Sequence, residues 1–136
     1  MLIVDDEPWV QQGLVKSIPW SDLGIQIVGS AFDGKTALDI YNKTAPEIVL
    51  TDIKMPIMDG LQLSSEINKI NKNTYIIFMS AYDEFEYARK AIEVNVKRYI
   101  LKPFGKEEII SIVEEACEEI KQDRAKNQAI EAGKLY

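Results

Sequence analysis

Histidine is absent from this 136-residue chain, and cysteine occurs once, as Cys117. The commonest general base is therefore missing, and with it Ser–His–Asp triads and most zinc sites. A single cysteine allows no internal disulfide and fits a reducing compartment. Any chemistry is expected from carboxylates, lysines and hydroxyl groups.

Long apolar runs and an excess of positive charge are also absent. No stretch approaches the roughly 20 apolar residues of a membrane-spanning helix, and the N-terminus lacks the basic start of a signal peptide. The net charge of −6 argues against non-specific binding to DNA or anionic membranes. We expect a cytoplasmic protein whose domain contacts neither nucleic acid nor membrane directly.

Short apolar runs alternate with segments of helical spacing along most of the chain. The runs are rich in β-branched and aromatic residues, which favours strands, and they occupy residues 2–4, 25–28, 48–50, 75–79 and 99–101. Between them, apolar residues recur every three to four positions, as in Val10, Leu14 and Ile18. This alternation predicts an α/β fold with a doubly wound, five-stranded parallel sheet.

The helical pattern fades after Ile120, where the chain stays helix-prone but becomes polar. We therefore expect one domain over residues 1–120. Residues 121–136 are expected to form a helical extension or linker.

Carboxylates follow two of the predicted strands. Asp5, Asp6 and Glu7 come directly after the first strand, and Asp52 ends the third. The carboxyl ends of the strands in a doubly wound sheet meet at one edge, where ligands bind. Carboxylates this close resist ionisation unless a cation lies among them, and Mg²⁺ suits such a set of oxygen ligands.

A hydroxyl group and an ammonium group end two further strands. Ser80 follows the fourth and Lys102 the fifth, so both are expected beside Asp52. Each could contact a phosphoryl oxygen, which makes Asp52 a candidate nucleophile toward phosphorus. Each residue alone also fits an ordinary turn or strand end, so the hypothesis depends on their joint placement.

Four ordered motifs resemble the receiver domain of two-component response regulators. They are IVDDE from residue 3, TDIKMP from residue 51 with the DG that follows, SAY from residue 80 and YILKPF from residue 99. The resemblance covers about residues 1 to 120. It implies a flavodoxin-like sheet and a phosphoacceptor domain, not an enzyme, that is phosphorylated by a sensor histidine kinase.

The resemblance also implies roles by position. Asp52 would be the phosphoacceptor, and Lys102 would contact the phosphoryl group through a loop shaped by a cis peptide bond to the next residue. The Mg²⁺ ligands would be Asp6, Asp52 and the carbonyl group of Lys54. Asp5 would hold the ion directly or through water.

A conformational switch belongs to the same resemblance. Ser80 would be the switch hydroxyl and Tyr99 the switch aromatic, which turns inward when Ser80 bonds the phosphoryl group. The surface of the fourth helix (from about Asp83), the fifth strand and the fifth helix would then change, and could form a phosphorylation-dependent homodimer. The bulk of Lys54 and Tyr82 beside the attacking water predicts slow autodephosphorylation.

A finer resemblance concerns residues 19–24 and 81–88, which are similar to receivers that precede AraC-type helix-turn-helix output domains. Nothing after Ile120 is long or basic enough to be such a domain. We therefore expect part of a longer DNA-binding transcription factor, cut in the linker helix.

Three alternatives fit parts of the pattern. The first is a stand-alone single-domain response regulator. The second is an aspartyl-phosphate phosphohydrolase of the haloacid-dehalogenase type, which requires Asp-x-Asp, whereas Asp52 is followed by Ile53 and Lys54. The third is a flavodoxin-type protein, in which Asp5 and Asp6 would repel the phosphate of FMN.

Overall fold

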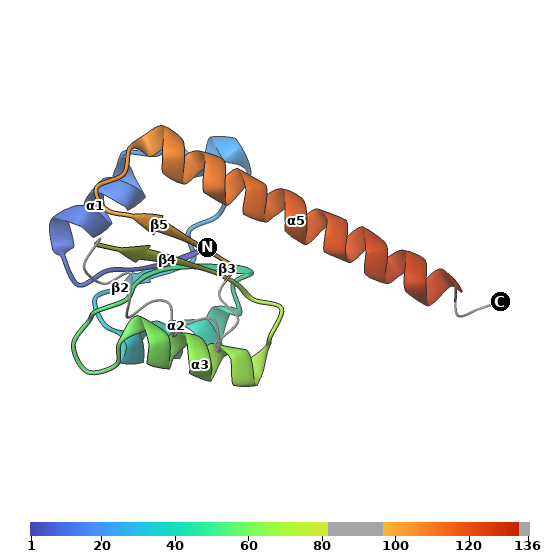
Figure 1. Cartoon of the computed structure of the whole chain (residues 1–136), viewed down its shortest axis with the longest axis horizontal. Coiled ribbons are helices and arrows are strands. Elements are labelled where there is room, and N and C mark those ends of the chain that lie inside the picture. Colours follow the sequence, from blue (N-terminus) through green and yellow to red (C-terminus); the bar gives the residue numbers. More distant parts are fainter. Residues whose placement is uncertain (82–96, 134–136) are drawn as a thin grey trace.

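Five parallel strands form a single sheet in the order β2-β1-β3-β4-β5 (Figure 1). The structure is a computed structural model that describes residues 1–81 and 97–133. The strands are β1 (Leu2–Val4), β2 (Gly29–Ala31), β3 (Ile48–Asp52), β4 (Tyr75–Ser80) and β5 (Arg98–Leu101). The predicted doubly wound parallel sheet is confirmed.

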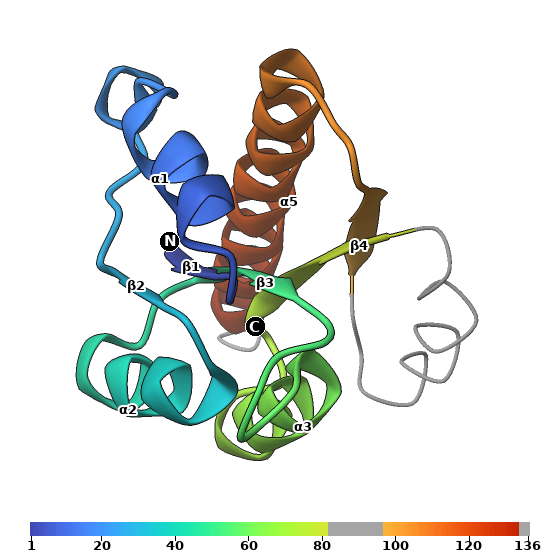
Figure 2. The same ribbon diagram turned by 90° about the vertical axis from the view of Figure 1, so that its left-hand side faces the viewer.

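Helices cover both faces of this sheet. They are α1 (Pro8–Lys16), α2 (Gly34–Thr44), α3 (Gly60–Ile70) and α5 (Lys106–Gly133), with a 3-10 turn η1 at Trp20–Leu23. The pair α1 and α5 lies on one face, and the pair α2 and α3 on the other (Figure 2). The predicted fourth helix from about Asp83, and Tyr82 with it, lie outside the described residues.

Each face of the sheet has its own apolar core. Ile3 and Leu50 point into the core under α1 and α5, while Leu2 and Val49 point into the core over α2 and α3. Successive residues of a strand point to opposite faces, so a sheet covered on both faces needs apolar residues at every position. This explains the continuous apolar runs at the start of the three inner strands β1, β3 and β4.

The predicted strand over residues 25–28 is wrong, because the second strand is Gly29–Ala31. The η1 turn leads into the preceding segment, where the N–H group of Ile25 donates to the carbonyl oxygen of Trp20. Ile25 is buried in the core under α1, although it precedes the strand. The apolar run therefore reports the burial of a connecting segment, and pairing with β1 begins at Gly29, opposite Leu2.

The loop after β3 is fixed by the start of α3. The carboxylate of Asp59 accepts a hydrogen bond from the N–H group of Gln62 and so caps the helix. The N–H group of Gly60 donates to the carbonyl oxygen of Ile53 at 2.6 Å. These bonds hold the backbone next to Asp52.

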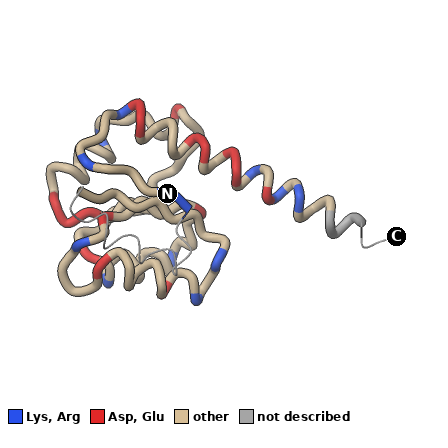
Figure 3. The backbone as a smooth tube through the Cα atoms, viewed as in Figure 1, with Lys and Arg blue, Asp and Glu red and all other residues tan. Residues whose placement is uncertain are grey.

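Helix α5 is 28 residues long, and only its first half packs against the sheet. Ile109, Val113 and Ala116 are buried, whereas residues 121–129 are exposed. The exposed part carries charges of both signs and projects away from the sheet (Figures 1 and 3). An ion pair joins Arg124 of this part to Glu47, just before β3. None of the described helices is long and apolar enough to cross a membrane.

Candidate functional site

Four carboxylates gather at the carboxyl ends of β1 and β3, which are neighbours in the sheet. Oxygen atoms of Asp5, Asp6, Glu7 and Asp52 all lie within 4.8 Å of one another. Asp5 and Asp52 are buried, Glu7 is partly exposed and Asp6 is exposed. The acidic residues therefore lie together at one edge of the sheet, as the sequence predicted.

The ammonium group of Lys102 lies among these carboxylates. Its Nζ atom is 3.0 Å from Asp5 Oδ2 and 3.2 Å from Asp52 Oδ2. Glu7 Oε1 lies further away, at 3.7 Å. The peptide bond between Lys102 and Pro103 is cis, as the resemblance implied.

Burial dominates the electrostatics of the site. It raises the pKa of Asp52 to about 7, although the nearby Lys102 ammonium group acts in the opposite direction. Burial also raises the pKa of Asp5, against the hydrogen bonds from the Glu7 N–H group and from Lys102. The pKa of Lys102 would be lowered by burial, but its contacts with Asp5 and Asp52 raise it above the ordinary value.

These residues fit a divalent cation. The cluster holds four carboxylates, two of them buried, and one ammonium group that pairs with three of them, so it keeps an excess of negative charge. Closely spaced carboxylate oxygens with access to water are the ligands that Mg²⁺ takes in proteins. Lys54 follows β3 in an exposed position, and a role for its carbonyl group as a ligand stays a prediction.

Ser80 ends β4 beside the acidic cluster. Its neighbour Met79 pairs with Asp52, and the carbonyl oxygen of Ser80 accepts a hydrogen bond from the N–H group of Lys102 at 2.7 Å. Ser80 is fully buried, and its Oγ atom has no hydrogen-bond partner among the described residues. Leaving a buried hydroxyl unpaired costs about 1–3 kcal/mol.

Tyr99 lies on the edge strand β5, opposite Phe78 in the register with β4. Its relative exposure is 43%, so the side chain is neither buried under α5 nor fully in solvent. A role as the switch aromatic, like the switch role of Ser80, stays a prediction.

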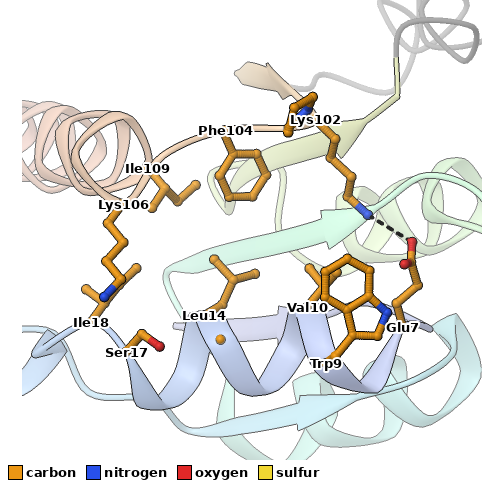
Figure 4. Close-up of a pocket in the computed structure, with 12 residues that line it drawn as sticks. Glu7, Trp9, Val10, Leu14, Ser17, Ile18, Lys102, Phe104, Lys106 and Ile109 are labelled. Atoms are coloured by element: carbon orange, nitrogen blue, oxygen red, sulfur yellow. Dashed lines mark ion pairs between the residues drawn. The ribbon is translucent and has the colours of Figure 1, made fainter.

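Sequence reasoning missed two features next to the cluster. The first is the ion pair between Glu7 and Lys102, for which the only signal was a third carboxylate after Asp5 and Asp6. The second is an apolar groove of about 460 Å³ between α1 and the start of α5 (Figure 4). Trp9, 73% exposed, lies in its wall, and Glu7 and Lys102 belong to both the groove and the cluster. No local pattern predicts this groove, because it forms between distant segments.

A parallel α/β domain with a lysine among acidic residues at the strand ends fits the phosphoacceptor domains of signalling proteins. The chain belongs to the response regulator receiver domain family, which it matches over residues 1–114. The resemblance drawn from the four motifs is therefore confirmed, and two-component signalling is the process to which such domains belong.

Solved structures agree with this assignment. The chain is similar to the REC domain of AraT, a response regulator from Geobacillus stearothermophilus, with a TM-score of 0.85 and 34% identity, over 90% of this chain and 95% of that one. It is also similar to a two component transcriptional regulator AraC from Clostridium phytofermentans ISDg, with a TM-score of 0.83 and 37% identity, over 91% and 96% of the two chains.

A curated relative, the uncharacterized transcriptional regulatory protein YesN of Bacillus subtilis (strain 168), is 38% identical over 122 residues. That match takes in 90% of this chain and 33% of YesN. The chain thus spans about a third of the length of this relative.

Proposed function

We propose that this domain accepts a phosphoryl group on Asp52 from a sensor histidine kinase, in a reaction that requires Mg²⁺. The observation that carries the proposal is the environment of Asp52, a buried carboxylate at the end of β3. Its Oδ2 atom lies 3.2 Å from Lys102 Nζ, and three further carboxylates lie within 4.8 Å. Acidic ligands, a nucleophile and a lysine are the parts that phosphoryl transfer to a carboxylate needs.

In this mechanism an Asp52 carboxylate oxygen attacks phosphorus. An O–P bond forms, the P–N bond to the kinase histidine breaks, and the electron pair returns to the imidazole. Asp6, Asp52 and the carbonyl group of Lys54 would hold Mg²⁺, with Asp5 ligating directly or through water. The ion would reduce the repulsion between the carboxylate and the phosphoryl oxygens. Lys102 would move from the carboxylates to a phosphoryl oxygen.

The groove along α1 is the surface that we assign to the kinase. It is mainly apolar, it contains the exposed Trp9, and it continues into the cluster through Glu7 and Lys102 (Figure 4). A partner that fills this groove would therefore be in contact with the phosphoacceptor site. Exposed tryptophans in such positions often dominate the binding energy of an interface.

The buried Ser80 hydroxyl supplies the switch in this proposal. It would donate to a phosphoryl oxygen, Tyr99 would turn inward, and the surface of β5, α5 and the fourth helix would change and favour a homodimer. Slow autodephosphorylation is expected from the bulk of Lys54 and Tyr82. The similarity to transcriptional regulators and the projecting part of α5 favour a DNA-binding output domain in the whole protein over a stand-alone regulator.

Intact mass measured after incubation with acetyl phosphate tests the phosphoacceptor. Wild type and the charge-matched control Asp39→Asn, an exposed position of α2, should each gain one phosphoryl group with Mg²⁺ and none with EDTA. Asp52→Asn should gain none. An adduct on folded Asp52→Asn, or none on wild type or on the control, would contradict the proposal.

A further inference from the structure

The start of helix α1 does not need the carboxylate of Glu7. Glu7 is the N-cap residue, yet its side chain makes no capping hydrogen bond. Effective N-cap side chains are short, as in Ser, Thr, Asp and Asn, and Glu is not among them. The Glu7 backbone is fixed instead by its N–H group, which donates to Asp5 Oδ1 at 2.9 Å. The helix start therefore offers the Glu7 carboxylate no hydrogen bond, only the general attraction of a helix N-terminus for negative charge, and the ion pair with Lys102 is its one specific side-chain contact among the described residues.

The Glu7 carboxylate faces Lys102 from the α1 side (Figure 4). Its Oε1 atom is 3.7 Å from Lys102 Nζ, and the Glu7 side chain is 45% exposed. Asp5 and Asp52 hold the same ammonium group from the interior, with carboxylate side chains that are 0% and 7% exposed. Lys102 thus lies between two inner carboxylates and one outer carboxylate.

We propose that Glu7 is a positioning residue for Lys102. The Glu7 carboxylate competes with the phosphoryl group for the Lys102 ammonium group. The inference rests on the proposed phosphoryl transfer to Asp52. Contact with a phosphoryl oxygen requires Lys102 to give up part of its contact with Glu7. The Glu7 pair therefore stabilises the unphosphorylated site and lowers the affinity for the phosphoryl group.

A double-mutant cycle separates this competition from simple charge repulsion. Beryllofluoride, a stable analogue of the phosphoryl group, is titrated with saturating Mg²⁺ into wild type, Glu7→Gln, Lys102→Met and the double variant. Binding is followed by ¹H–¹⁵N NMR, which measures weak as well as tight binding. Asp39→Asn controls for net charge, and Lys102→Gln replaces Lys102→Met should the latter unfold.

With Lys102 present, Glu7→Gln should tighten beryllofluoride binding about two- to fivefold, the range for a partly exposed ion pair. Without Lys102, the same substitution should have no effect beyond about 1.7-fold, the smaller limit within which independent substitutions add. Asp39→Asn should match wild type.

Three results would overturn the inference. Equal tightening with and without Lys102 means that Glu7 acts by general repulsion. Weaker binding of beryllofluoride and of Mg²⁺ alone means that Glu7 ligates the metal. No change in either background means that the pair has no role. If wild type binds no beryllofluoride with Mg²⁺, the proposed function fails as well. Normal binding without coupling between Glu7 and Lys102 overturns only the role of Glu7.

Discussion

Gly60 occupies a position in which a side chain would clash with the backbone of the phosphoacceptor site. A Cβ atom there would lie 2.2 Å from the carbonyl oxygen of Asp52 and 2.9 Å from the Cα atom of Ile53. Both neighbours are backbone, which cannot move aside as a flexible side chain can. The close approach lets α3 begin directly against the end of β3.

The substitution Gly60→Ala should lower the free energy of unfolding by about 1–3 kcal/mol, the usual cost of overpacking. It should also slow phosphorylation by acetyl phosphate, since the backbone that carries Asp52 must shift. Urea denaturation and intact mass measure the two effects.

Gly13→Ala is the matched control for this prediction, because nothing lies within 4 Å of its Cβ position inside α1. In an exposed helix interior the change from glycine to alanine should raise stability by roughly 0.5–1 kcal/mol. Equal stability changes for the two variants would show that the close approach at Gly60 is not what matters.

At the scale of elements, α1 and the start of α5 act together as one surface. Trp9 lies in the first turn of α1, and its side chain is 73% exposed beside Glu7 (Figure 4). A large exposed side chain contributes little to the stability of the domain, so Trp9 is available to a partner.

Trp9→Ala should leave the rate of phosphorylation by acetyl phosphate unchanged and reduce kcat/KM for transfer from a histidine kinase about 30-fold, equivalent to about 2 kcal/mol. A panel of purified kinase cores is first screened for transfer to wild type, and the fastest is used. Ile70→Ala, which removes an exposed apolar side chain at the end of α3, should affect neither rate. A Trp9 variant that accepts phosphoryl groups normally from the kinase would exclude this groove as the docking surface.

The elements differ in how well the sequence predicts them. Strands buried on both faces, such as β3 and β4, are evident from composition alone, because the positions before their carboxyl ends are apolar on both faces. Residues 25–28 gave a wrong strand prediction because Ile25 is buried in the core without joining the sheet. The true second strand, Gly29–Ala31, pairs with β1 through its backbone groups, which the sequence does not reveal.

The site divides in a similar way. Asp5, Asp52 and Lys102 could be predicted, since each ends a strand and parallel strands end at one edge. The order of distances around Lys102 could not, because it depends on how far each side chain reaches across the site. The sequence likewise gives no sign that Trp9 lies in a groove.

At the scale of the whole molecule, the proposed switch links Ser80 to the assembly state. Moving a two-state equilibrium from mostly off to mostly on takes roughly 5 kcal/mol. One hydrogen bond from Ser80 to a charged phosphoryl oxygen would supply about 1.5–3 kcal/mol of this.

Ser80→Ala should therefore still bind beryllofluoride with Mg²⁺. The ratio of active to inactive protein in the bound state should fall about 10-fold or more. Analytical ultracentrifugation in the presence of beryllofluoride should find a smaller dimeric fraction for Ser80→Ala than for wild type at the same protein concentration. NMR titration confirms that both bind the analogue. Equal dimerisation of the two proteins would show that Ser80 does not couple phosphorylation to assembly.

The continuity of α5 has a consequence for the whole regulator. A helix of 28 residues is about 42 Å long and turns by about 100° with each residue. An output domain joined to its end would have its orientation set by the number of residues in α5. One residue inserted after Ile120 would rotate that domain by more than a quarter turn about the helix axis. Seven inserted residues would nearly restore its original orientation. If the whole protein carries the proposed output domain on this helix, the length of the exposed segment is under a rotational constraint, even where its side chains are free to vary.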